Sequence, residues 1–80
     1  MAERRWSVTI ENKFHDVVVK WSRWSNTGEV RVDGSIVKSW RSGPWLLKEV
    51  EFTIKQNKAF LQSKGIIMEN WDLYIGGKKY

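Results

Sequence analysis

The chain has no cysteine and only one proline and one histidine among its 80 residues. The absence of cysteine excludes disulfide bonds, thiol nucleophiles, thiolate zinc sites and redox switching. It also favours a reducing compartment, so we expect a cytoplasmic protein. A domain this small without disulfides has little net stability, and we expect its six tryptophans to supply much of the buried apolar area.

Long apolar runs are missing as well. The first residues, MAERRWSVTI, contain two arginines but no apolar stretch after them, so we expect neither a signal peptide nor a membrane span. Helical periodicity is not sustained over three turns anywhere. There is no linker or low-complexity segment, which predicts one domain over residues 1–80.

Catalytic motifs such as GxSxG, HExxH, a phosphate loop or GxGxxG do not occur. His15 begins a predicted strand, where a structural hydrogen bond or a surface position is more common than the role of a general base. Its neighbour Asp16 points to the opposite strand face, so the pair is a poor chelate. Glu49 and Glu51 form the kind of exposed pair that is typical of a solvated strand. We expect no enzyme, no cofactor and no metal site.

The net charge of +5 raises the possibility of a nucleic-acid ligand, but the charge sits mainly at the two ends. Between Trp6 and Gly77, ten basic and eight acidic residues leave a charge of +2. These charges alternate in sign along the chain and form no basic stripe. The body of the domain therefore has the pattern of an ordinary solvated surface.

What the sequence does contain is short alternations of apolar and polar residues, which predict β-strands. Turn residues separate them every eight to twelve positions, and this spacing predicts an all-β fold with seven to eight antiparallel strands, either a two-sheet sandwich or a flattened barrel of meander type. The predicted strands are Trp6 to Ile10, His15 to Arg23, two arms within Asn26 to Trp40, Trp45 to Ile54 with a bulge near Leu47 or Lys48, Ala59 to Gln62, Ile66 to Met68, and Trp71 to Ile75. Edges for pairing with another chain are expected at the first strand or at Ala59 to Met68.

The clearest local prediction is a hairpin closed by Asp33 and Gly34. A DG pair favours a two-residue type I′ turn, because both positions need a positive φ. That turn fixes the register of the arms. The predicted cross-strand pairs are Val30 with Val37, Glu29 with Lys38, and Val32 with Ser35.

The tryptophans fall into two groups. Trp6, Trp21 and Trp71 are in phase with aliphatic residues of their strands, which predicts that they are buried. Trp24 and Trp45 lie at the edges of loops, where the phase assigns no face. Aromatic side chains at such places can stack on bases or sugars. The candidate binding surface consists of Trp24, Trp45 and the two nearby arginines, Arg23 and Arg41.

Several motifs occur together in an order that resembles the Fas apoptotic inhibitory molecule family. They are Trp6, His15, Thr27 with Gly28, Val32 with Asp33 and Gly34, Trp40, the strand EVEFTI at Glu49 to Ile54, and WDLYIGGK at Trp71 to Lys78. The resemblance runs from Trp6 to Lys79. It implies an all-β domain of about eight antiparallel strands in two packed sheets and an intracellular, non-enzymatic role in regulating apoptosis or protecting against aggregation.

The chain departs from that family in having one domain instead of two in tandem, so it resembles a single-domain relative. The stretch WSRWSN is also richer in tryptophan, and Arg41 to Trp45 resembles an added turn. No binding residue is transferred by the resemblance. The leading hypothesis is a protein-interaction or protective module that binds another protein, without membrane contact, as a monomer or weak homodimer. The alternative is binding of single-stranded nucleic acid or oligosaccharide through exposed tryptophans.

Overall fold

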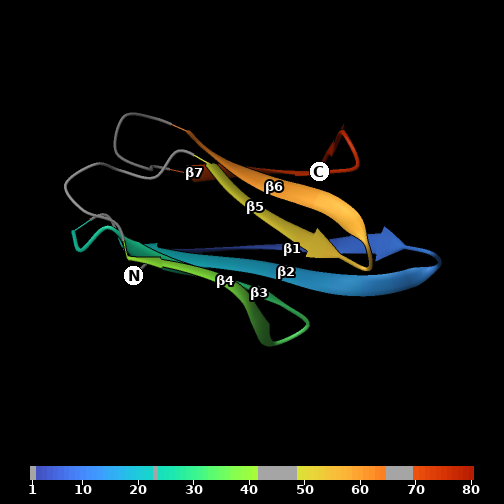
Figure 1. The fold of residues 1–80 in the computed structure, drawn as a ribbon, viewed down its shortest axis with the longest axis horizontal. Helices are drawn as coiled ribbons and strands as arrows, with labels where there is room; N and C mark the ends of the chain where they lie inside the picture. The colour runs from blue at the N-terminus through green and yellow to red at the C-terminus, as the bar shows by residue number, and fades with distance from the viewer. Residues whose placement is uncertain (1, 23, 42–48, 65–69) are drawn as a thin grey trace.

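The computed structural model describes residues 2–22, 24–41, 49–64 and 70–80, and all regular structure in these ranges is β-strand. Eight strands form two antiparallel sheets of four, ordered β1-β2-β3-β4 and β5-β6-β7-β8. The two open sheets lie in two layers (Figure 1), which confirms the all-β fold and the sandwich alternative. The strands are β1 (Ala2–Ile10), β2 (Lys13–Ser22), β3 (Thr27–Val32), β4 (Ser35–Arg41), β5 (Glu49–Ile54), β6 (Asn57–Lys64), β7 (Asn70–Ile75) and β8 (Lys78–Lys79).

The first hairpin is longer than the sequence predicts. The predicted strands, Trp6 to Ile10 and His15 to Arg23, leave four residues between them, but the turn consists of only Glu11 and Asn12, whose φ angles are 53° and 64°. Because both residues adopt the left-handed conformation, the two strands pair up to Ile10 and Lys13. No glycine marks the two turn positions, so the turn is predicted in the right region but two residues too long. The turn at Lys55 and Gln56 also has two positive φ angles and no glycine.

The turn between β3 and β4 is the predicted one. Asp33 and Gly34 have φ angles of 52° and 85°, as a type I′ turn requires. Val32 pairs with Ser35, which confirms the innermost predicted pair.

A β-bulge changes the rest of that hairpin. Val30 pairs with Lys38 instead of Val37, and Val37 is the extra residue. The predicted pairing of Glu29 with Lys38 is therefore wrong as well, because Glu29 pairs with Ser39.

The bulge determines on which face of the sheet Trp40 lies. In the shifted register Trp40 lies opposite Gly28. Without the shift it would lie opposite Thr27 and on the outer face of the sheet, since successive side chains of a strand alternate between faces. The bulge therefore brings a large indole to the side of the core, where it packs against Trp71 with ring centroids 5.7 Å apart.

In the second sheet β6 lies between β5 and β7. It extends from Asn57 to Lys64, so the predicted strand from Ala59 to Gln62 is too short. The expectation of a free edge at Ala59 to Met68 is wrong for the described part, because β6 is hydrogen-bonded on both sides. The rest of that expected edge, residues 65–68, lies outside the described residues. The same holds for the predicted strand at Ile66 to Met68 and the predicted bulge near Leu47 or Lys48.

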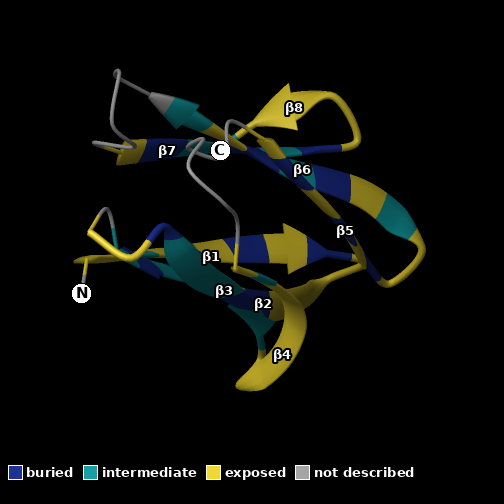
Figure 2. Ribbon diagram, turned by 60° about the vertical axis from the view of Figure 1, so that its left-hand side comes forward, coloured by how far each residue is buried: buried dark blue, intermediate teal, exposed yellow. Residues whose placement is uncertain are grey.

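One hydrophobic core fills the space between the sheets, and buried and exposed positions alternate along the strands that face it (Figure 2). Trp6, Trp21 and Trp71 belong to it with exposed fractions of 8%, 4% and 0%, which confirms the prediction for these three residues. The other buried members are Val8, Ile10, Val17, Val19, Val30, Val50, Phe52, Ile54, Ala59, Leu61, Leu73 and Ile75.

An arginine connects the two sheets at the side of β1. The Arg4 guanidinium donates to the Trp71 carbonyl oxygen at 2.7 Å and to Asn70 Oδ1 at 3.1 Å. It also lies over the Trp6 ring, 4.8 Å from the centroid. Arg4 thus satisfies a backbone carbonyl of one sheet from a strand of the other, with its charge resting on an aromatic face.

Candidate functional site

Two of the four residues of the predicted binding surface are described, and they lie at the same end of the first sheet. Trp24 belongs to the turn between β2 and β3 and is 94% exposed. Arg41, the last residue of β4, is exposed and pairs with Thr27 at the end of that turn. Arg23 and Trp45 lie outside the described residues. Trp24 and Arg41 are therefore both exposed at this end of the sheet.

A hollow of about 460 Å³ lies beside Arg41, on β3 and β4. Its lining residues are Thr27, Gly28, Glu29, Ser39, Trp40 and Arg41. The ring of Trp40 lies so close to Gly28 that any side chain at this position would overlap it. Gly28 is thus required by the close approach of an aromatic ring, and the same ring lines the hollow.

The most exposed strand of the first sheet is β4, which has only β3 as a hydrogen-bonded neighbour among the described strands. Every residue of β4 except Trp40 is exposed. Two of them are large and apolar, with Ile36 54% and Val37 39% exposed. We call Ile36 to Arg41 the β4 edge. A free strand edge presents unpaired backbone N–H and C=O groups, which makes it a template for another strand.

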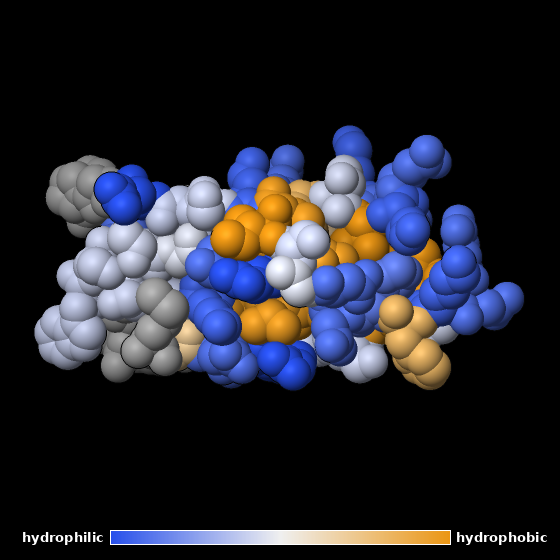
Figure 3. Space-filling model, turned by 90° about the horizontal axis from the view of Figure 1, so that it is seen from below, coloured by the Kyte–Doolittle hydropathy of each residue, from blue (hydrophilic) through white to orange (hydrophobic). Residues whose placement is uncertain are grey.

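Apolar side chains also appear on the outer face of the first sheet (Figure 3), where they lie in the middle of the view with hydrophilic side chains around them. Cross-strand pairing forms a row of neighbouring residues on this outer face, one from each strand. The row consists of Arg5, Val18, Arg31 and Ile36. Val18 is only 7% exposed although it points away from the core. This face of β2 is therefore partly covered, and Ile36 is the apolar residue of this row that lies on β4, at the edge of the sheet.

The two cations of the β4 edge differ from most other charges of the first sheet. Glu3 lies 3.9 Å from Arg5 and 3.8 Å from Lys20, and Arg31 pairs with Glu29. Lys38 and Arg41, by contrast, have no ion-pair partner among the described residues. The β4 edge therefore carries positive charge that the described part of the domain does not neutralise.

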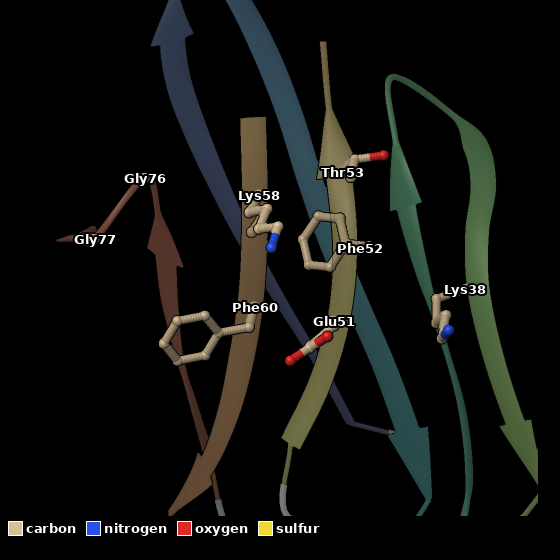
Figure 4. Close-up of a pocket in the computed structure, with 9 residues that line it drawn as sticks. Lys38, Glu51, Phe52, Thr53, Lys58, Phe60, Gly76 and Gly77 are labelled. Carbon is tan, nitrogen blue, oxygen red and sulfur yellow. The ribbon is translucent and has the colours of Figure 1, made fainter. Parts of the chain in front are cut away.

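A second hollow, of about 670 Å³, lies on the second sheet and reaches β4 (Figure 4). Glu51 and Thr53 of β5 and Lys58 and Phe60 of β6 contribute side chains, and Lys38 lies on the neighbouring β4. Phe60 stacks on Tyr74, with centroids 4.8 Å apart and an interplanar angle of 15°. Sequence reasoning missed this aromatic pair, although the alternation of Ala59 and Leu61 with Phe60 indicates that Phe60 faces outward.

His15 is buried and makes a structural hydrogen bond, which is one of the two alternatives that the sequence predicts. Its Nδ1 lies 2.7 Å from Asp33 Oδ2, and the backbone N–H of Asp16 donates to Asp33 Oδ1 at 3.0 Å. These contacts, first the hydrogen bond from His15 and then the one from Asp16, lower the pKa of Asp33 below its ordinary value. Because an ionised carboxylate only accepts, Nδ1 is the donor. The second nitrogen, Nε2, is buried without a hydrogen-bond partner in the described structure.

Other candidate chemistry is sparse in the ranges that the structure describes. No group of three or more His, Asp or Glu residues there is placed to hold a metal ion. Glu49 and Glu51 are both exposed on β5, as predicted. No helix in these ranges is long and apolar enough to cross a bilayer. The feature that remains is a surface with exposed apolar and basic side chains along a free strand.

No known family model matches this chain, and no curated protein sequence matches it closely enough to be a relative. The geometry of the site differs from the sequence prediction in its main element, since the β4 edge was not among the expected edges. An edge strand and a central strand have the same local pattern, and only the strand order distinguishes them.

Proposed function

We propose that the chain is a non-enzymatic, intracellular protein-binding module that accepts an extended segment of another protein along the β4 edge. The observation that carries this proposal is the exposure of Ile36 and Val37 on a strand that has a hydrogen-bonded neighbour on one side only among the described strands. Backbone hydrogen bonds to a free edge supply affinity, and neighbouring side chains supply selectivity. Proteins usually protect long edges from such pairing, so an edge with exposed apolar residues favours a binding role.

The resemblance to the Fas apoptotic inhibitory molecule family supports the same kind of function. A role in regulating apoptosis or in protecting against aggregation would act through a bound protein and would need no catalytic group. Aggregating chains present extended, β-forming segments, and an edge that covers one of them blocks its growth. We therefore place the chain among protective or regulatory modules of this type.

The proposal is tested with isotope-labelled protein and a short peptide of alternating valine and threonine. Amide shifts on titration are expected to be largest for β4. Replacing both apolar residues, as Ile36→Ser with Val37→Ser, is expected to weaken binding at least several-fold, because the buried apolar area of the complex is lost. Phe14→Ser is the matched control, since Phe14 is 78% exposed on another strand. Largest shifts away from β4, or equal effects of the two replacements, would refute the proposal.

The second candidate function is stacking of a nucleic-acid base or a sugar on Trp24, because this indole is 94% exposed. The test is a titration with oligothymidylate and with a glycan panel, followed by tryptophan fluorescence. Stacking predicts a quench that Trp24→Ala removes and that persists in moderate salt. A signal that disappears entirely on adding salt and is unchanged in Trp24→Ala would leave only nonspecific charge attraction.

A further inference from the structure

The charge of the β4 edge limits which partner segment can pair with it. Lys38 and Arg41 are its only charged residues, and neither has an ion-pair partner in the described part of the chain. The other described edge strands longer than two residues both carry acidic side chains, Glu3 on β1 and Glu49 and Glu51 on β5. We infer that the segment that docks on β4 is an acidic strand. This inference rests on the proposed function.

The register of β4 also predicts how far apart the acidic residues lie in the partner strand. After the bulge at Val37, Lys38 pairs with Val30 and points toward the core side, while Arg41 pairs with Thr27 and points outward. In a strand that pairs with Lys38 to Arg41, each side chain lies on the same face of the sheet as the residue opposite it. Acidic residues three positions apart in the partner therefore lie beside Lys38 on one face and beside Arg41 on the other.

A second copy of this chain is a poor occupant of the same edge. Two β4 strands paired with each other bring Lys38 and Arg41 of both copies together without any acidic residue between them. Like charges placed across paired strands are destabilising, and basic edge residues are a common protection against self-pairing. The same charges attract an acidic strand, so the edge discriminates between these two occupants.

The experiment uses the full chain and a seven-residue peptide of threonine and valine with glutamate at its second and fifth positions. A peptide with glutamine at both positions is the neutral probe. Each ion pair on an exposed surface contributes up to about fivefold in affinity, so the glutamate peptide is expected to bind up to roughly 25-fold more tightly at low salt. The difference is expected to shrink as salt is added.

The variants Lys38→Gln and Arg41→Gln are each expected to remove up to about fivefold of the affinity for the glutamate peptide. Binding of the glutamine peptide is expected to stay unchanged. Both side chains are exposed, so circular dichroism should report an intact fold. Lys13→Gln is the matched control, because Lys13 is an exposed lysine at the far end of β2.

The outcomes separate the inference from the function on which it rests. Equal affinity for the two peptides, with amide shifts on β4 in both cases, overturns the acidic partner and leaves the protein-binding proposal standing. No shift on β4 with either peptide overturns both. If the molar mass in solution doubles as the protein concentration rises, and if Lys38→Gln strengthens this dimerisation, the occupant of the edge is a second copy. That result also overturns the acidic partner.

Discussion

His15 Nδ1 lies 2.7 Å from Asp33 Oδ2, and this contact joins the second strand to the turn between β3 and β4. The backbone completes the connection, because the Asp33 N–H donates to the Asp16 carbonyl oxygen at 2.9 Å. Asp33 therefore has two functions. Its backbone supplies a left-handed turn position, and its side chain ties that turn to the neighbouring hairpin.

The lowered pKa of Asp33 predicts a pH dependence of stability. A carboxyl whose pKa falls on folding stabilises the protein above its ordinary pKa of 3.8, and this contribution is lost as the pH falls through the lowered value. Asp33→Asn keeps the turn type but removes the charge, so it should destabilise the protein at neutral pH. Urea unfolding should show the two proteins converging in acid. Asp16→Asn is the control, and an equal pH dependence in both variants would contradict the assignment.

Gly28→Ala is expected to destabilise the protein by about 1–3 kcal/mol, because the added methyl group overlaps the Trp40 ring. The test is a double-mutant cycle with Trp40→Ala, measured by urea unfolding. In the Trp40→Ala background the same change should cost much less, since the overlap is gone. If the two costs were simply additive, close approach of the ring would not be the reason for glycine.

Trp71→Ala should cost about 3–5 kcal/mol, which is enough to unfold much of a domain of this size. Trp71 is fully buried and contacts Trp21 and Trp40, with ring centroids 6.1 and 5.7 Å away. Trp24→Ala is the matched comparison and should change the free energy of unfolding by no more than about 0.5 kcal/mol. Chemical denaturation followed by far-ultraviolet circular dichroism measures both, and similar losses would contradict the assignment of the core.

Arg4→Lys is expected to cost about 1–2 kcal/mol, because a lysine cannot reproduce the forked donation to Trp71 and Asn70 together with the contact over Trp6. The neighbouring change Arg5→Lys should be nearly neutral. Arg5 is exposed, and its ion pair with Glu3 is long, at 3.9 Å, and open to solvent. Thermal unfolding of the two variants makes the comparison. A larger effect for Arg5 would show that Arg4 does not link the sheets.

The candidate site was only partly predictable. Trp24 lies at the edge of a loop and Arg41 is a nearby arginine, and both are exposed. The β4 edge and the Phe60–Tyr74 pair were missed, because whether a strand lies at an edge, and what faces its outer side, depend on strands that are distant in sequence.

The sequence by itself determined the all-β class, the turn at Asp33 and Gly34, and the burial of Trp6, Trp21 and Trp71. These follow from alternation and from backbone preference, which act over a few residues. Tertiary structure decided the bulge at Val37 and the strand order that places β4 at the edge of its sheet among the described strands. The bulge depends on burying Trp40 against Trp71, a residue of the other sheet. Such contacts bring together residues that are far apart in the chain, and no local pattern contains them.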